Sequence, residues 1–377
     1  MQKSTRNNKK IALVTSGGGL KAAFYHLGFS KALEEKEIYL SENEKGQHIR
    51  TFVGSSGGAI FSALAASGFS LDDMIDSFTR GEGKLKHITY FDLLSFNKSL
   101  PRYFLKGLKK NHLNIRCPED IIKNLLRIES PFSTDGIEEY IRSVLPTNDF
   151  RKLKPELFIT GTRLNPVEGF YKDVFCRHDF HNEEFQALYR SDIAISEAVA
   201  ASCAIPGLLA PRTIKSNIGS IDFIDGETRK TLSTHIARDA DAELIFVSYT
   251  HVPYEFKENI GSLKKFGIAV VLTQAINIAL SQRIENAKLI YTAKKDALDA
   301  IKEYANKCSI PDDAAKKLAK YVAKRLRYNS KLVQVTTHPT DNEFFLEPYL
   351  DPSKDCAKKI INHGYEQGLK DLNMHGF

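Results

Sequence analysis

The feature that most constrains this chain is a glycine- and serine-rich turn between an apolar run and a small-residue segment. Residues 54–58 read Gly-Ser-Ser-Gly-Gly, after the apolar run 51–53 and before a segment of helical character over 59–66. This G-x-S-x-G pattern is typical of a nucleophile elbow, in which a tight strand-to-helix turn exposes a central serine, here Ser56. Gly54 and Gly58 would let the strand and the helix approach closely. The pattern is common enough to need support from its context.

A second glycine-rich turn lies near the N-terminus. Residues 10–15 predict a buried strand, which leads through Ser16 into three consecutive glycines, Gly17, Gly18 and Gly19, and then into a helical segment. Such a turn presents backbone N–H groups that can stabilise an oxyanion, and one such donor lowers a barrier by about 3 kcal/mol. A phosphate-binding loop is the competing interpretation, but neither G-x-G-x-x-G nor the P-loop spacing is met. A tight turn with no chemical role is the other alternative.

The third element is an acidic turn far along the chain. Residues 221–224 form a short strand-like run that stops at Asp225 and Gly226. Asp-Gly at a strand end is by itself ordinary turn chemistry. A serine hydroxyl, however, needs a neighbouring proton acceptor to become a good nucleophile. Asp225 is the candidate for that base, provided that partial burial raises its pKa.

Together these elements resemble the patatin-like phospholipases, a family of lipid acyl hydrolases with a Ser–Asp dyad. The G-G-G-x-[KR] loop of the family matches residues 17–21, its G-x-S-x-G matches 54–58, and its D-G matches 225–226. A small-residue segment ending in proline, 200–207, lies upstream of the aspartate, as in the family. The resemblance covers roughly residues 9–250 and resumes over 352–365. It implies an α/β fold, with a mostly parallel central sheet sandwiched by helices.

The resemblance also implies a role for each residue. Ser56 would attack the ester carbonyl, Asp225 would act as general base, and the oxyanion would be held by Gly17, Gly18, Gly19 and Lys21. A dyad of this kind needs no histidine, unlike a Ser-His-Asp triad. The chain contains 11 His. A histidine-based triad therefore stays open as an alternative, with His26, His235 and His251 closest to the motifs.

The organisation of the chain follows from its apolar runs. Residues 10–15, 51–54, 156–162 and 244–250 predict strands separated by helical segments, which indicates a mostly parallel sheet, and 169–175 predicts an added antiparallel strand. We expect a catalytic core over 9–250 with an insertion at about 84–130. A helical C-terminal elaboration over 251–377 would pack on the core and partly complete it. The apolar run 266–280 predicts a buried helix.

Composition bounds the class of protein and its location. The five Cys are scattered without metal-binding spacing, so we expect reduced thiols, no structural metal and no cofactor. The apolar run behind the basic N-terminus is too short for a signal peptide, and no run reaches the ~18 residues of a membrane span. We therefore expect a cytoplasmic or peripheral membrane protein, and signal-independent secretion stays open. The net charge of +7 is modest and comes without a nucleic-acid-binding motif, so we expect no nucleic-acid partner.

Two segments suggest contact with membranes. Residues 316–327 predict a basic amphipathic helix; we expect its apolar stripe to pack on the core, with binding to anionic lipid as the alternative. Residues 90–105 interleave aromatic side chains, leucines and lysines, which fits either a lid over the serine or an ordinary helical insertion.

The sequence therefore predicts a serine esterase of the phospholipase A type, acting on phospholipids or lysophospholipids. Two alternatives stay open. One is a catalytically weak protein of the same fold that binds a membrane or a partner, and the other is a hydrolase of another acyl ester such as an acylglycerol. The need for a protein activator is also open.

Overall fold

The computed structural model describes residues 9–42, 46–97, 130–182, 187–216, 219–326, 328–329 and 332–377. Much of the expected insertion at 84–130, and residues 98–105 of the aromatic segment, lie outside the described residues. The lid hypothesis for that segment therefore stays a prediction.

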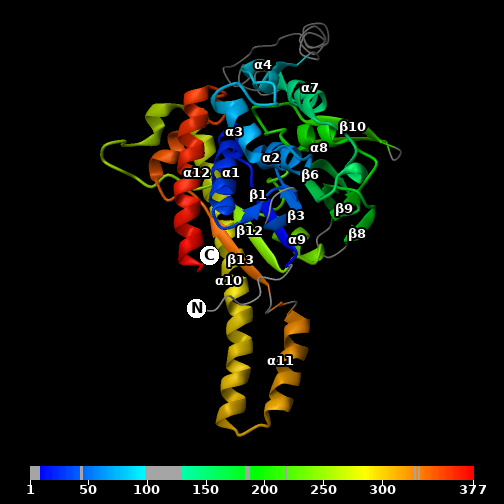
Figure 1. Ribbon diagram of the computed structural model, residues 1–377, viewed down its shortest axis with the longest axis vertical. Helices are drawn as coiled ribbons and strands as arrows, with labels where there is room; N and C mark the ends of the chain where they lie inside the picture. Colours follow the sequence, from blue (N-terminus) through cyan, green and yellow to red (C-terminus); the bar gives the residue numbers. More distant parts are fainter. Residues whose placement is uncertain are drawn as a thin grey trace, which may run out of the picture.

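A central sheet organises the chain (Figure 1). Five neighbouring strands run parallel, in the order β13 (Val333–Thr337), β12 (Leu244–Ser248), β1 (Ile11–Thr15), β3 (Gln47–Gly54) and β6 (Glu156–Val167). The sheet continues through β7 (Phe170–Phe175), β9 (Ala187–Arg190) and β8 (Phe180–Asn182), with β7 antiparallel to β6. Three further strands join at its sides: β2 (Ile38–Tyr39) on β3, β11 (Gly219–Ile224) antiparallel to β6, and β10 (Arg212–Ser216) on β11. The predicted strands and the mostly parallel α/β fold are confirmed.

The two faces of the sheet bury different apolar clusters. Ile11 and Leu13 of β1 point into the larger core, whereas Ala12 and Val14 point into a smaller one on the opposite face. This alternation follows from the two-residue period of a strand, and burial on both faces explains why the parallel strands are almost wholly apolar.

Helices cover both faces. The larger core is closed by α1 (Gly19–Glu34), α2 (Gly57–Ala66), α3 (Leu71–Thr79), α7 (Asp135–Val144), α8 (Ile195–Ser202) and α12 (Lys354–Met374). The smaller core is covered by α9 (Thr234–Asp239) and part of α10 (Ile268–Lys307). Shorter elements are α4 (Tyr90–Leu93), the paired β4 (Ser95–Phe96) and β5 (Phe132–Ser133), and the 3-10 turns η1 (Phe150–Lys152), η2 (Leu263–Phe266) and η3 (Asn342–Leu346). None of the described helices combines the length and apolar composition that crossing a bilayer takes.

The C-terminal segment is built into the core. Its strand β13 pairs with β12, and α12 lies along α1 (Figure 1). The two helices approach so closely that glycines form the contact: a Cβ on Gly28 would lie 1.9 Å from the Ile361 carbonyl oxygen, and one on Gly364 would lie 2.3 Å from that of Tyr25. The parallel core therefore depends on residues from both ends of the chain.

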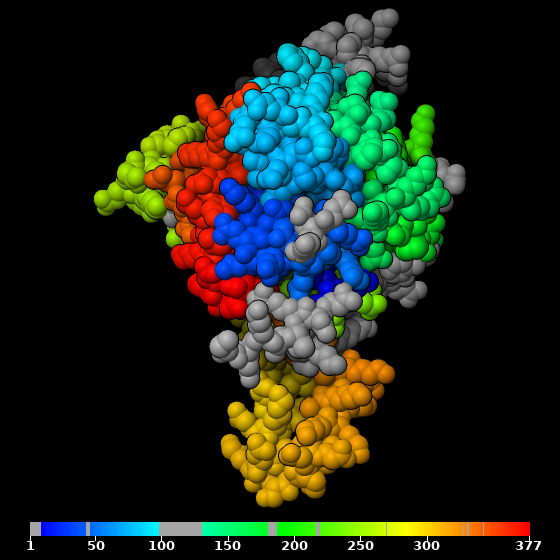
Figure 2. Space-filling view, in the orientation of Figure 1, coloured from blue at the N-terminus to red at the C-terminus, as the bar shows by residue number. Residues whose placement is uncertain are grey.

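Two expectations about the C-terminal helices are wrong. The run 266–280 is largely helical, as predicted, but it is not buried: Ile268 is 79% exposed and Leu272 is 57% exposed. The basic helix α11 (Asp312–Leu326) has no buried residue and does not pack its apolar stripe on the core. It lies beside the distal half of α10 in a hairpin that projects from the body (Figures 1 and 2). Helical periodicity predicted the elements correctly, but it does not say which face meets the rest of the protein.

We predict that Gly28→Ala lowers the free energy of unfolding by about 3 kcal/mol, because the new methyl group forces α1 and α12 apart. Urea denaturation measures this loss. Lys358→Ala, an exposed substitution on α12, is the control and should change stability by less than about 0.5 kcal/mol. Equal stability of the two variants would contradict the tight glycine contact.

Candidate active site

Ser56 occupies the sharp turn between β3 and α2. Its φ of 52° and ψ of −124° lie in a sparsely populated region for a residue with a side chain, which costs on the order of 1–3 kcal/mol. Its N–H donates to the Ser202 hydroxyl at 2.8 Å, at the end of α8. Only 3% of Ser56 is exposed. The backbone is the one that a nucleophile elbow requires, but the serine is nearly buried where that motif exposes it.

Asp225 follows β11 and returns to the same edge of the sheet. β11 runs antiparallel to the second half of β6. The C-terminal end of β11 therefore lies near the C-terminal end of β3, which pairs with the first half of β6. The Asp225 N–H donates to the Ala204 carbonyl at 2.9 Å, and the Gly226 N–H donates to that of Ser202 at 3.2 Å. The small-residue segment 200–207 thus holds both the serine and the aspartate.

The environment of Asp225 suits a general base. Burial raises the pKa of its carboxyl to about 6, and hydrogen bonds from the Glu227 N–H and the Ser56 hydroxyl offset part of that rise. A base with this pKa is largely ionised at neutral pH and accepts a proton more readily than an exposed aspartate. The structure therefore brings Ser56 and Asp225 together.

The glycine loop between β1 and α1 lies directly against the serine turn. A Cβ on Gly17 would lie 2.8 Å from that of Ser56, and one on Gly57 would lie 1.9 Å from the Gly19 carbonyl oxygen. The Thr250 hydroxyl holds the loop from the other side, by donating to the Gly17 carbonyl at 2.9 Å. Side chains larger than hydrogen would separate these turns, so glycine is required by the close approach of two backbones.

The three glycines do not have equivalent N–H groups. The Gly17 N–H donates to Glu227 Oε1 at 3.1 Å. Gly18 has a φ of 130° and Gly19 begins α1, where the first N–H groups of a helix have no partner within the helix. Gly18 and Gly19 are thus better placed than Gly17 to serve an oxyanion.

Lys21 points away from the serine turn. Its ammonium group donates to the Phe344 carbonyl at 3.1 Å and lies over the rings of Phe344 and Tyr349, at 4.7 Å and 4.3 Å from their centroids. Burial lowers its pKa to about 7. These contacts hold the C-terminal segment against α1. They favour a structural role for Lys21, and its predicted part in holding the oxyanion stays a prediction.

The three candidate histidines have other surroundings. Because a carbonyl only accepts, His26 Nε2 must donate to the Ser16 carbonyl, at 2.9 Å. The other ring nitrogen of the neutral imidazole, Nδ1, therefore accepts from the Ser248 hydroxyl at 2.7 Å. Burial lowers the pKa of His26 to about 4, and that of His251 likewise. Burial also lowers the pKa of His235, on α9, where nearby Lys172 adds to the effect. The groups that act on the Asp225 carboxyl are Ser56 and Glu227, with no histidine among them.

Sequence reasoning missed Glu227. It is buried at the glycine loop, where Oε1 accepts from Gly17, and its own N–H donates to Asp225 Oδ1 at 2.8 Å. Burial and the charge of Asp225 raise its pKa to about 8. The available signal was its position two residues after Asp225, which puts a second carboxyl in the same turn.

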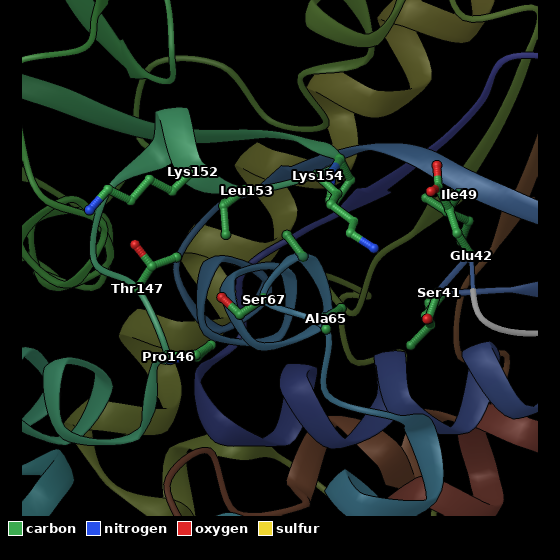
Figure 3. A pocket seen from close by; sticks show the side chains of 14 residues that line it. Ser41, Glu42, Ile49, Ala65, Ser67, Pro146, Thr147, Lys152, Leu153 and Lys154 are labelled. Atoms are coloured by element: carbon green, nitrogen blue, oxygen red, sulfur yellow. The ribbon is translucent and has the colours of Figure 1, made fainter.

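One cavity lies at the opposite edge of the sheet (Figure 3). It has a volume of about 260 Å³ and is lined by the end of α2 and the approaches to β3 and β6, including Ala65, Ser67, Lys152 and Lys154. None of its residues belongs to the serine turn, the glycine loop or the Asp225 turn, so it is separate from the candidate site. Across the residues that the structure describes, no group of three or more His, Cys, Asp or Glu side chains is placed to hold a metal ion.

Comparison with known proteins assigns the family. The family model described as "Patatin-like phospholipase" matches residues 13–238, a span that contains the glycine loop, the serine turn and the Asp225 turn. This chain belongs to the patatin-like phospholipase family. The family is one of lipid hydrolases, so the predicted family and the general class of chemistry are confirmed. No curated protein sequence matches the chain significantly.

Solved structures similar to this patatin-like chain include two bacterial proteins. VipD from Legionella pneumophila is 14% identical with a TM-score of 0.43, over 98% of this chain and 67% of that one. The structure of the ExoU–SpcU complex from the type III secretion system of Pseudomonas aeruginosa matches at 15% identity with a TM-score of 0.25, over 97% of this chain and 76% of that one.

We predict that Lys21→Met flattens the dependence of stability on pH. A lysine whose folded pKa of about 7 lies below its unfolded value binds fewer protons in the folded state, so it makes the protein more stable as the pH rises through that interval. Between about pH 7 and pH 9 the native chain should gain about 2 kcal/mol of unfolding free energy relative to the variant.

Urea denaturation at the two pH values measures this difference. Turnover of a soluble ester should fall less than about tenfold in the variant, because the ammonium is not at the serine. A loss of turnover of about a thousandfold, with the pH dependence of stability unchanged, would show that Lys21 acts on the oxyanion.

Proposed function

We propose that this protein is a lipid acyl hydrolase that cleaves the ester bonds of phospholipids or lysophospholipids through Ser56 and Asp225. The observation that carries the proposal is the buried carboxyl of Asp225, with a pKa near 6, beside a serine in a strained strand-to-helix turn. Membership of the patatin-like phospholipases supports a lipid ester as substrate.

The proposed reaction uses two half-steps. Asp225 accepts the proton of the Ser56 hydroxyl as the oxygen attacks the ester carbonyl, and the N–H groups of Gly18 and Gly19 stabilise the oxyanion. The proton then passes from Asp225 to the departing alcohol, which leaves an acyl group on Ser56. In the second half-step Asp225 takes a proton from water as the water oxygen attacks the acyl carbonyl. The bond to Ser56 then breaks, the fatty acid leaves, and Asp225 returns the proton to the Ser56 oxygen.

The helices behind the turns support the same chemistry. Both α1 and α2 begin at the site, α1 at Gly19 and α2 at Gly57, so the positive ends of two helix dipoles lie where negative charge develops. Burial increases this effect, because water screens the charges less. Asp225 can accept a proton in this environment without a histidine between it and Ser56.

Replacing each serine of the turn tests the nucleophile. Ser56→Ala should reduce fatty-acid release from mixed phospholipid vesicles by at least about a thousandfold and abolish labelling by a fluorophosphonate probe. Ser55→Ala is the matched control: its hydroxyl is bonded to that of Thr160 at 2.6 Å and acts on Glu227 but not on Asp225, so activity should stay within about tenfold of the native value.

Three results would change the proposal. If the probe labels the native chain and the chain cleaves acylglycerols but not phospholipids, the substrate is a different ester. Neither labelling nor hydrolysis would favour a binding protein of the same fold. Equal loss in both serine variants would remove Ser56 as the nucleophile.

We predict a bell-shaped pH dependence of kcat/KM for a soluble ester. Activity should fall below about pH 6, where protonation removes the base Asp225, and above about pH 8, where ionised Glu227 beside Gly17 opposes the negative oxyanion. Glu227→Gln should keep the acid limb and lose the alkaline limb. Rates are corrected with Ser56→Ala as the blank. An alkaline limb that survives in Glu227→Gln would assign it to a different group.

A further inference from the structure

The first three turns of α10 place five apolar side chains in solvent, before Leu280 and Ile284 of the same helix turn inward. Ile268, Leu272 and Ile276 are 79%, 57% and 48% exposed, and Val271 and Ile278 are also exposed. At 100° per residue these five positions share one side of the helix, over an arc of roughly 160°. We call them the outer face of α10.

The inner side of the same turns carries the polar groups. Gln274 donates to the Tyr254 carbonyl at 2.8 Å and accepts from its N–H at 2.9 Å, and Asn277 donates to the Val252 carbonyl at 3.3 Å. Asn277 is only 2% exposed. A surface helix ordinarily buries its apolar side and exposes its polar side, so this part of α10 is oriented the other way. An apolar face that the described part of the chain leaves exposed marks an interaction surface.

The helix that carries this face is tied to the candidate active site. Val252, which Asn277 holds, lies two residues after Thr250, whose hydroxyl bonds to the glycine loop. Farther along α10, Arg283 donates to the Thr228 carbonyl at 2.7 Å. The Thr228 N–H in turn donates to the Asp225 carbonyl. The helix is thus tied to both the loop and the base turn of the site.

The charges along the sequence from residue 259 to residue 284, which follows the exposed Glu255 and Glu258, favour one partner. Between Glu258 and Glu285 the chain has no acidic residue, and its only charged side chains are the basic Lys264, Lys265 and Arg283. Phe266, just before the helix, is exposed beside Lys265, and the segment that leads into α10 protrudes from the body (yellow-green, left of Figure 2). Apolar and aromatic side chains bordered by lysines match the interface of an anionic bilayer.

We propose that the outer face of α10 docks on an anionic phospholipid surface and so brings the site to its substrate. This inference rests on the proposed function for its purpose, but the binding itself is independent of catalysis. The helix lies in the interface and does not cross it, with its isoleucines and leucine among the acyl chains and Lys264 and Lys265 at the headgroups.

A fluorescent reporter tests the contact directly, since the chain has no tryptophan. In Phe266→Trp, the emission should shift to shorter wavelength when vesicles of phosphatidylcholine and phosphatidylglycerol are added, and much less with phosphatidylcholine alone. Tyr304→Trp, an exposed position on the distal half of α10, is the control and should not shift. A shift at Tyr304→Trp and none at Phe266→Trp would overturn the proposal.

A matched pair of triple variants tests the face. Ile268→Gln with Leu272→Gln and Ile276→Gln should weaken sedimentation with the mixed vesicles at least about tenfold. The same change at the distal Leu289, Ile290 and Tyr304, which are equally exposed, should leave binding unchanged. Circular dichroism checks the helix. Should the first variant fail to fold, Lys264→Gln with Lys265→Gln gives a second test, the loss of preference for phosphatidylglycerol.

Activity measurements separate this proposal from the catalytic one. The face variant should lose fatty-acid release from vesicles but keep hydrolysis of a soluble butyrate ester and fluorophosphonate labelling. Ser56→Ala should lose all three activities and still bind vesicles. Vesicle binding that is absent in the native chain, or equal in the native chain and the face variant, would overturn the membrane surface. A native dimer in analytical ultracentrifugation that becomes a monomer in the face variant would also overturn it, because a second copy of the chain would then cover the face.

Discussion

The close contact of two backbone turns is the constraint on which the site depends. β1 and β3 are adjacent and parallel, so the turns after them lie at the same edge of the sheet. There a Cβ on Gly57 would reach within 1.9 Å of the Gly19 carbonyl oxygen, and one on Gly58 within 2.5 Å of that of Ser16. Because the turns touch, Ser56 is held in its strained conformation directly beside the N–H groups of the glycine loop. The proposed nucleophile and the proposed oxyanion donors thus lie in one closely packed unit.

Burial of two carboxyl groups supplies the electrostatics of that unit. Removing Asp225 from water costs stability, but the same loss of hydration raises its pKa to about 6, which suits its proposed role as a base near neutral pH. Glu227 is more strongly affected, with a pKa of about 8, and at neutral pH it is mostly uncharged. At neutral pH the same turn therefore carries one charged and one neutral carboxyl. The charged one, Asp225, is suited to accept a proton, and the neutral one, Glu227, binds the Gly17 N–H.

The C-terminal third connects this site to its surroundings. β13 extends the parallel sheet, α12 packs on α1, and Lys21 binds the carbonyl groups of η3, so the helix that begins at the glycine loop is held by residues more than three hundred positions away. α10 also packs against this part of the protein. Its inner side bonds to the segment after β12, and its outer face is free to meet a lipid surface in the described structure. Catalytic geometry and membrane contact would therefore share one helix.

The sequence by itself determined the elements whose signals are local. Apolar runs indicated β1, β6 and β12, and glycine spacing indicated the two turns, since strand period and turn chemistry depend on neighbouring residues. Asp225 followed from its motif. Only the tertiary structure decided how far a long or buried side chain reaches: Lys21 contacts the C-terminal segment, and Glu227 contacts a loop 210 residues earlier. It also decided that the first three turns of α10 expose their apolar side. Periodicity defines the faces of a helix, but packing against distant segments selects the one that is buried.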